Sequence, residues 1–266
     1  MKRNNVKHLR LRTRNISCTP LKAMIVPKRT IYRMGSTTPT EAITRCTDYL
    51  EINSPESCKI SGDKILMKQK FIENEIPTAE FITINQDEDF NSFKERLENA
   101  LHDWKRIIIK HKHSSKGNGI YFIDSTESLN EWLTNNNPYN HIFEKYYTYS
   151  KEYRLHVDDQ NGCFYTCRKM LKNDAEVRWH RHENNSVWIL EDNPMFDKPN
   201  NWDSIVQDCV RAIKAVGLNI GAVDVKVQTH VENPRYIILE TNSAPALGEV
   251  GIEKYKEALI NYINNN

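Results

Sequence analysis

Two short segments near the end of the chain carry residues that could bind a metal ion. Residues 221–227 (GAVDVKV) have the pattern of a strand that contains Asp224, and residues 236–245 (YIILETNSAP) have that of a strand that ends with Glu240 and Asn242. Because strand side chains repeat with a period of two, Glu240 and Asn242 point to the same face. Three hard oxygen ligands on rigid strands suit Mg²⁺, which keeps some waters and completes its octahedron with phosphate oxygens. The pattern therefore predicts a nucleotide enzyme.

The Asp…Glu-x-Asn pattern followed by Ser-Ala-Pro resembles the C-terminal metal site of the ATP-grasp superfamily of carboxylate–amine ligases. From about residue 31 to 262, the order of the segments is also similar to small stand-alone members, such as ribosomal-protein glutamate ligases and relatives in bacterial viruses. The resemblance implies an α+β fold in which two α+β lobes clasp ATP, preceded by a shortened N-terminal lobe. It implies ATP and one or two Mg²⁺ ions as cofactors, with Mn²⁺ able to replace Mg²⁺.

Two lysines lie where that family holds the nucleotide phosphates. Lys64 opens a helix after a polar turn, and Lys110 ends an apolar strand. The loop after Lys110, residues 111–119 (HKHSSKGNG), resembles the family's glycine-rich phosphate cover, with Ser115 and Gly117 against the nucleotide. Serine and glycine let backbone N–H groups approach an anion. The alternatives are a surface lysine and a polar hairpin loop.

Residues 143–147 (FEKYY) resemble the segment that links the two ATP-binding lobes. The resemblance implies that Glu144 and the backbone of Lys145 and Tyr146 meet the adenine edge. Glu152 lies eight residues after Glu144, where the family places an acid on the ribose hydroxyls; a carboxylate can accept two such bonds. Either glutamate could instead form a surface ion pair.

Relatives often carry an arginine two residues before the metal-binding aspartate, where this chain has Ala222. Another cation must then meet the charge of the phosphoryl group and of the tetrahedral intermediate. Arg154, Arg168 and Lys169 are the predicted catalytic residues, and Arg178 is a further candidate. Arg154 is our first choice because it shares a strand face with the predicted ribose acid.

The elements that must position these residues follow from apolar periodicity. Helices are expected at about 61–75 (capped by Ser61), 88–104, 129–133, 202–216 and 252–263. Strands are expected at 23–26, 31–34, 106–110, 119–123, 152–157, 163–170 and 187–190, before the two metal strands. This mixed order indicates α+β lobes. We expect a shortened N-terminal lobe with a basic arm at 1–60, an ATP-grasp N-lobe at 61–146 and a C-lobe with the metal site at 147–266.

The charge of the chain is unevenly distributed. Residues 1–40 contain ten Lys and Arg and no Asp or Glu, which leaves 27 basic and 35 acidic residues in the remainder. Such a basic arm could steer an anionic partner, nucleic acid included. The favoured interpretation is a solvated edge strand guarded by Lys and Arg, or a role with an anionic small substrate.

Other features exclude several classes of protein. The six cysteines fit no zinc motif and are expected to be reduced thiols of a cytoplasmic protein. His180 and His182 are expected to be exposed loop residues. No run approaches the length of a membrane span, and the N-terminus lacks the apolar core of a signal peptide, so no membrane partner is expected.

The sequence therefore predicts an ATP-dependent, ADP-forming carboxylate–amine ligase that acts through an acyl phosphate. Its partners would be a small-molecule or peptide carboxylate and an amine. Two alternatives are a small-molecule kinase of the same fold and a nucleic-acid-binding protein with a vestigial nucleotide site. A ligase needs an amine for turnover, whereas nucleic-acid binding would depend steeply on salt. The intact metal set counts against the second alternative. The sequence does not name the acid, the amine or the oligomeric state.

Overall fold

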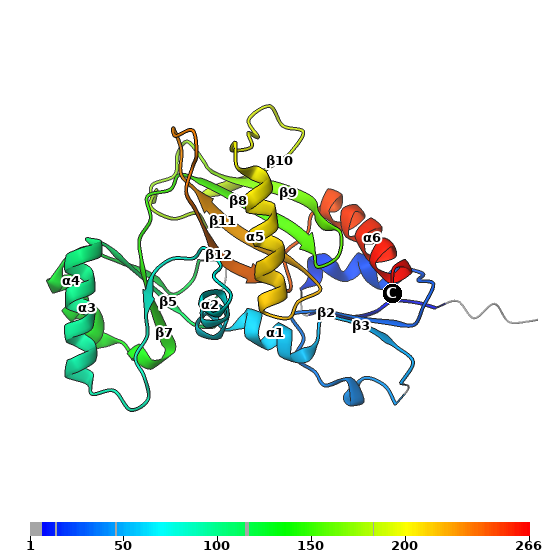
Figure 1. Ribbon diagram of the computed structural model, residues 1–266, viewed down its shortest axis with the longest axis horizontal. Coiled ribbons are helices and arrows are strands. Elements are labelled where there is room, and N and C mark those ends of the chain that lie inside the picture. Colours follow the sequence, from blue (N-terminus) through cyan, green and yellow to red (C-terminus); the bar gives the residue numbers. More distant parts are fainter. Residues whose placement is uncertain (1–6, 14, 46, 115–116, 183) are drawn as a thin grey trace, which may run out of the picture.

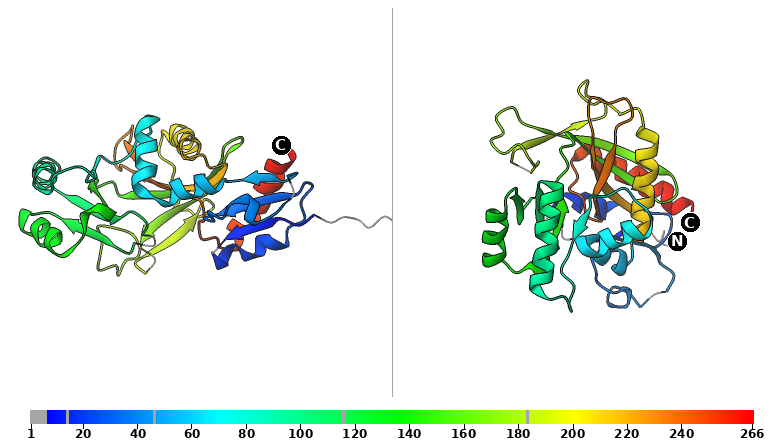
Figure 2. Two further views of the ribbon diagram at one scale, coloured as in Figure 1. Left: turned by 90° about the horizontal axis from the view of Figure 1, so that it is seen from below. Right: turned by 60° about the vertical axis from the view of Figure 1, so that its left-hand side comes forward.

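The computed structural model describes residues 7–13, 15–45, 47–114, 117–182 and 184–266, which form three sheets with helices packed on them (Figure 1). Figure 2 shows these parts in a row, with helices α3 and α4 at one end and the N-terminal sheet with helix α6 at the other. Within the described residues, no helix is long and apolar enough to cross a membrane.

The N-terminal sheet is parallel, with strand order β1-β2-β3. It consists of β1 (Arg10–Thr13), β2 (Thr30–Met34) and β3 (Leu50–Ile52), with 3₁₀ helices η1 (Ile16–Ala23) and η2 (Thr40–Ala42) in the connections. The C-terminal helix α6 (Glu249–Asn264) returns to this lobe, where its Tyr255 and Leu259 share a core with Leu11 and Tyr32. The two ends of the chain therefore form one lobe.

Two details of this lobe bear on the sequence predictions. Strand β1 is an edge strand on which Arg10 and Arg12 are exposed, in agreement with the solvated-edge interpretation of the basic arm. The prediction of a strand at 23–26 was wrong. Ala23 ends η1, and Ile25 forms only an isolated bridge with His8.

The central sheet is antiparallel, with strand order β4-β7-β5-β6. Its strands are β4 (Phe81–Ile82), β5 (Ile107–His111), β6 (Ile120–Ile123) and β7 (His141–Lys145), with η3 (Pro138–Asn140) leading into β7. Helices α3 (Phe90–Trp104) and α4 (Thr126–Asn135) contribute Phe93, Leu97 and Trp132 to a core with Ile109 and Phe143. The other face of the sheet is left for the cleft.

The large sheet is antiparallel, with strand order β10-β9-β8-β11-β12. Its strands are β8 (Lys151–Asp158), β9 (Gly162–Leu171), β10 (Ser186–Leu190), β11 (Ile220–Val227) and β12 (Tyr236–Asn242). Helix α5 (Trp202–Ala215) covers one face, where Ile205 and Ile213 pack on Tyr153, Leu155 and Val223. Because side chains alternate along each strand, the residues between these face the opposite side.

The helix expected to start at Ser61 is two helices, α1 (Pro55–Gly62) and α2 (Lys64–Glu73). Ser54 caps α1 by accepting a bond from the Ser57 N–H at 3.0 Å. Asp63 caps α2 by accepting from the Ile65 N–H at 2.9 Å. Serine at the N-cap with proline at the first helical position is a common start of a helix. The prediction of Ser61 as the cap was therefore wrong.

Candidate active site

A cleft of about 740 Å³ lies between the central sheet and the large sheet, with side chains from both lining it. Its volume is within the range of small-molecule and cofactor sites. Every predicted site residue lines the cleft except Arg168 and the further candidate Arg178, which do not, and Ser115, which lies outside the described residues. The cleft brings together Lys64, Lys110, Gly117, Glu144, Lys145, Tyr146, Glu152, Arg154, Lys169, Asp224, Glu240 and Asn242.

The three predicted metal ligands come from two paired strands. Asp224 of β11 lies opposite Glu240 of β12, and Asn242 is two residues further along β12. The Asn242 Oδ1 accepts a bond from the Ala244 N–H at 2.9 Å, which orients its amide. Within the described ranges, no three His, Cys, Asp or Glu side chains gather as a metal site. The set is instead two carboxylates and one amide, and an all-oxygen donor set of this kind fits Mg²⁺.

Arg154 binds directly to one of these ligands. Its Nε lies 2.7 Å from Asp224 Oδ1 and its Nη2 lies 2.8 Å from Oδ2, across the register pair of β8 and β11. Burial opposes the charge of Arg154, but Asp224 outweighs it, so the pKa of the guanidinium lies above its ordinary value. The guanidinium carbon lies 4.6 Å from the centre of the Trp188 ring. Arg154 thus lies in the cleft beside the predicted metal ligands.

The prediction that Arg168 faces the cleft was wrong. Lys169 follows it on β9 and lines the cleft, so Arg168 points to the opposite face of the sheet. There Arg168 donates to Asp197 and, at 2.9 Å, to the Met195 carbonyl. Arg178 is exposed and does not line the cleft. Arg154 and Lys169 are the predicted catalytic cations that the structure places in the cleft.

Glu144 lies at the floor of the cleft between the buried Lys68 and the partly buried Lys110. Its Oε2 accepts from Lys110 Nζ at 2.6 Å, and its Oε1 lies 3.6 Å from Lys68 Nζ. Burial raises the pKa of the Glu144 carboxyl, but the two lysines outweigh burial and hold it below its ordinary value. Burial lowers the pKa of Lys68 to about 8, against the opposing effect of Glu144. Sequence reasoning missed Lys68, although its spacing of four residues from Lys64 puts both on one helix face.

Lys64 connects the metal strands with the loop that follows β5. Its Nζ donates to the Ser114 carbonyl and lies 3.7 Å from Glu240 Oε2. Its ammonium group therefore lies in the cleft beside Glu240.

Glu152 is surrounded by cations that sequence reasoning named only in part. Its carboxylate lies 3.7 Å from Lys169 Nζ and 3.5 Å from Arg181 Nη1, and its register partner on β11 is Lys226. Burial lowers the pKa of Lys226 to about 8, and its Nζ lies 5.3 Å from the centre of the Tyr146 ring. Lys226 could have been found, because it is two residues from Asp224 on the same strand and therefore shares its face.

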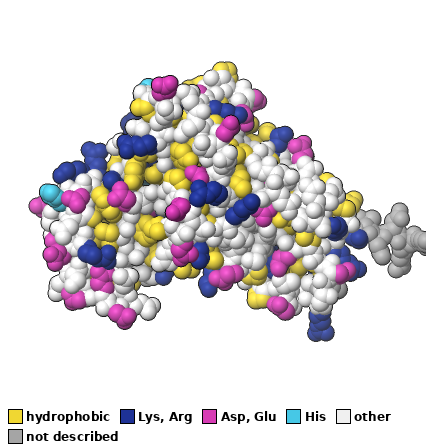
Figure 3. All heavy atoms as spheres, viewed as in Figure 1, with side chains coloured by type: hydrophobic (Ala, Val, Ile, Leu, Met, Phe, Trp, Pro, Cys, Tyr) yellow, Lys and Arg dark blue, Asp and Glu magenta, His cyan; other side chains and the backbone are white. Residues whose placement is uncertain are grey.

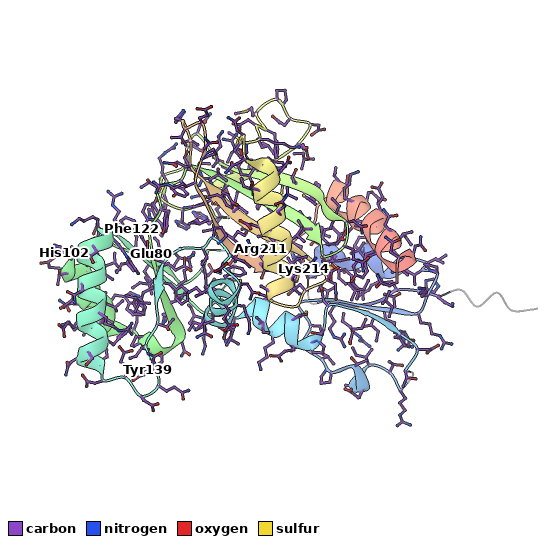
Figure 4. The ribbon with its side chains drawn as sticks, viewed as in Figure 1. Glu80, His102, Phe122, Tyr139, Arg211 and Lys214 are labelled. Atoms are coloured by element: carbon purple, nitrogen blue, oxygen red, sulfur yellow. The ribbon has the colours of Figure 1, made fainter. Side chains whose placement is uncertain are left out.

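Residues 143–147, the segment predicted to link the two lobes, contact Glu80, which directly precedes β4. Lys145 donates from its backbone N–H to the Glu80 carbonyl at 2.9 Å and from Nζ to the Glu80 carboxylate at 2.6 Å. The Tyr146 N–H donates to the Arg106 carbonyl at 3.1 Å. Both N–H groups are therefore bonded within the protein and are not free donors for a base. Glu80 is labelled in Figure 4.

The loop between β9 and β10 covers the end of the cleft at which Tyr146 lies. The centres of the Trp179 and Phe122 rings lie 5.3 Å apart. The backbone carbonyl of Trp179 accepts a hydrogen bond from the Tyr146 hydroxyl at 3.0 Å. His180 lines the cleft, so the expectation that it is an exposed loop residue was wrong. Burial, with the nearby His182, Lys169 and Lys226, lowers the pKa of His180 to about 4.

The opposite end of the cleft is closed by the N-terminal lobe. Asn15 donates from Nδ2 to the Ala244 carbonyl at 3.3 Å and the Pro245 carbonyl at 3.2 Å. The Ser17 hydroxyl accepts from the Leu247 N–H at 3.1 Å. The lining here is neutral and comprises Asn15, Ala244, Ala246, Leu247 and Gly248.

On the face shown in Figure 3, Lys and Arg side chains lie next to hydrophobic surface between the part that contains helices α3 and α4 and the part that contains helix α5.

Several solved structures share the architecture of this chain. Neither a family model nor a curated protein matches the sequence. D-alanyl-alanine synthetase A from Vibrio cholerae O1 biovar eltor superimposes with a TM-score of 0.63 at 14% identity, over 89% of this chain and 76% of that one. D-alanine–D-alanine ligase from Bacillus anthracis in complex with ATP gives 0.60 at 13% identity, over 86% and 73%. The ATP-grasp ligase PsnB with a phosphomimetic precursor variant, Mg and ADP gives 0.56 at 17% identity, over 82% and 62%.

Proposed function

The chain has the ATP-grasp fold, as its sequence predicted, and we propose that it is an ATP-dependent, ADP-forming carboxylate–amine ligase. The observation that carries the proposal is that one cleft unites three oxygen ligands of the large sheet with lysines of α2 and β5. Mixed oxygen ligands beside several lysines are the groups that polyphosphate recognition needs. The division into lobes at 1–60, 61–146 and 147–266 is part of the proposal, although helix α6 of the last range packs in the core of the N-terminal lobe.

The nucleotide would lie between the central and large sheets. Lys64 and Lys110 would hold the phosphates, and Glu152 would accept the ribose hydroxyls. Asp224, Glu240 and Asn242 would hold one or two Mg²⁺ ions, or Mn²⁺, which would neutralise charge on the β- and γ-phosphates. Ser115 and Gly117 remain predicted contacts of the phosphates. Support for the nucleotide comes from the neighbours solved with ATP and with Mg and ADP.

The proposed reaction has two steps. An oxygen of the acid substrate attacks the γ-phosphorus while the bond to the ADP oxygen breaks, which leaves an acyl phosphate. The amine nitrogen then attacks the acyl carbon, loses a proton, and inorganic phosphate departs as the amide forms. Arg154 and Lys169 are the cations that would stabilise the oxyanion of the tetrahedral intermediate, since Ala222 supplies none. The protein chiefly provides position and positive charge.

The acid and the amine would bind at the neutral end of the cleft, near Asn15 and Leu247. Both a small molecule and a peptide are compatible with this proposal. The D-alanine ligases are named for a small amino acid, and PsnB was solved with a minimal precursor. We place the reaction in the cytoplasm, where the five free cysteines described in the structure would stay reduced.

The test is a screen of amino acids and peptides for amine-dependent ADP release, with the product identified by mass spectrometry. A ligase sustains ADP release only when acid and amine are both present. Its product has the combined mass of the acid and the amine minus one water. Glu240→Ala is the control that should abolish the signal. A phosphorylated product without an amine requirement would favour the kinase alternative. Salt-sensitive nucleic-acid binding without nucleotide turnover would contradict the enzyme assignment.

A further inference from the structure

Asp224 is bound at both carboxylate oxygens by a residue of its own cleft. Arg154 makes a two-pronged contact of 2.7 and 2.8 Å, and the two side chains are 13% and 9% exposed. Such fork-to-fork pairs are strong and geometrically specific. A metal ion that takes Asp224 as a ligand must therefore compete with a guanidinium for the same carboxylate.

We propose that Arg154 is an exchanging residue, which neutralises Asp224 in the nucleotide-free cleft and is released to the phosphoryl group when the metal and nucleotide bind. The inference rests on the proposed function and adds an order of events to it. Metal binding at Asp224 frees the guanidinium at the moment when a new anion, the transferring group, enters the cleft. The same residue thus protects the empty site from an unpaired buried carboxylate and supplies a cation to the occupied one.

The surroundings of Arg154 allow this exchange. The ring of Trp188 supports the guanidinium at 4.6 Å, and a cation can stay on an aromatic face while its hydrogen bonds change. Lys169 lies over the same ring at 5.3 Å, but its closest carboxylate is Glu152, at 3.7 Å. Both lysine and arginine thus share one aromatic support, yet only Arg154 contacts a metal ligand. Lys169 is therefore a matched control for Arg154.

The experiment measures Mn²⁺ binding to the full-length protein in the presence of ADP, by electron paramagnetic resonance or calorimetry. Arg154→Gln removes the competitor and should tighten Mn²⁺ binding about tenfold relative to wild type, the lower end of close charge-pair couplings. Lys169→Gln removes an equal charge from the same wall and should change the affinity by much less. Equal effects of the two variants, or weaker Mn²⁺ binding in Arg154→Gln, would overturn the proposal and make Arg154 a positioning residue for Asp224.

A second variant covers the case in which Arg154→Gln does not fold. Arg154→Lys keeps the charge but loses the fork, so it should bind Mn²⁺ more tightly than wild type, though by less than tenfold; an affinity at or below that of wild type counts against competition. Tryptophan fluorescence gives an independent readout. Addition of Mn²⁺ and ADP should change the signal of wild type, and much of that change should be lost in Trp188→Phe. An identical change in both proteins would mean that Arg154 does not move.

The outcomes separate this inference from the ligase proposal. A protein with the predicted order of Mn²⁺ affinities that forms no amide keeps the exchange and refutes the ligase. A protein that forms an amide while all variants bind Mn²⁺ with equal affinity supports the ligase proposal and refutes the exchange. If wild type and both variants bind no Mn²⁺ with ADP, the metal ligands themselves are wrong and the exchange falls with them.

Discussion

Replacing Glu144 with glutamine should lower the unfolding free energy of the nucleotide-free protein. Bound nucleotide should restore part of that loss. Glu144 is the shared counter-ion of Lys110, at 2.6 Å, and Lys68, at 3.6 Å, and its side chain is 3% exposed. Glutamine keeps the size of the side chain but removes the carboxylate that faces the buried Lys68 and the partly buried Lys110. The phosphates of ADP would bring negative charge to the same lysines.

The magnitude follows from burial. Breaking a buried ion pair by removing one partner costs about 3–5 kcal/mol of unfolding free energy. In a chain of this size each kcal/mol lowers Tm by roughly 2–4 °C, so a drop of about 6 °C or more is expected. Glu80→Gln is the matched control, because Glu80 also holds a lysine, Lys145, at 2.6 Å, but is 55% exposed. An exposed pair contributes about 0–1 kcal/mol.

The assay is thermal and urea unfolding of wild type, Glu144→Gln and Glu80→Gln, with and without ADP and Mg²⁺. We expect the gap between Glu144→Gln and wild type to narrow when ADP is present, while Glu80→Gln stays near wild type throughout. Equal Tm values for the two variants would refute the argument from burial. A gap that ADP leaves unchanged would refute the placement of phosphates beside Lys110.

Three further predictions concern the metal, the loop and pH. Alanine at each metal ligand should leave a folded protein but abolish ATP turnover, and full turnover in Glu240→Ala would sink the assignment. Gly117→Ala should weaken nucleotide affinity more than Gly119→Ala: both have positive φ, but only at Gly117 would the new Cβ meet His182 Cβ at 2.9 Å. His180 has a pKa lowered from 6.5 to about 4, so the unfolded chain binds the proton first as pH falls. The unfolding free energy should therefore decline between about pH 6.5 and 4, and His180→Gln should flatten that decline in urea titrations; an unchanged slope would contradict the shift.

The sequence was most informative where strand alternation and residue chemistry agreed. Glu240 and Asn242 could be placed on one face because strand side chains alternate with a period of two, and the pairing of β11 with β12 brings Asp224 opposite Glu240. Glu152 and Arg154 obey the same rule on β8, and both line the cleft. Local periodicity also located most strands and helices to within a few residues.

The sequence was least informative where pairing or packing decides. Arg168 and Lys169 are neighbours on β9, so alternation excludes one of them, but only the register with Glu152 shows that Lys169 faces the cleft. The contact of Arg154 with Asp224 joins residues 70 positions apart, which no local pattern encodes. Lys68 is buried only because α2 packs between two sheets, with Thr78 and Ile238 beside its Nζ.

The most direct test of the whole account is a crystal structure of the protein with Mg²⁺ and a non-hydrolysable ATP analogue. We expect a metal about 2.0–2.1 Å from oxygens of Asp224, Glu240 and Asn242, with the analogue's phosphates beside Lys64 and Lys110. The guanidinium of Arg154 should have left Asp224. A nucleotide bound outside the cleft, or a cleft occupied without metal at these ligands, would contradict these expectations.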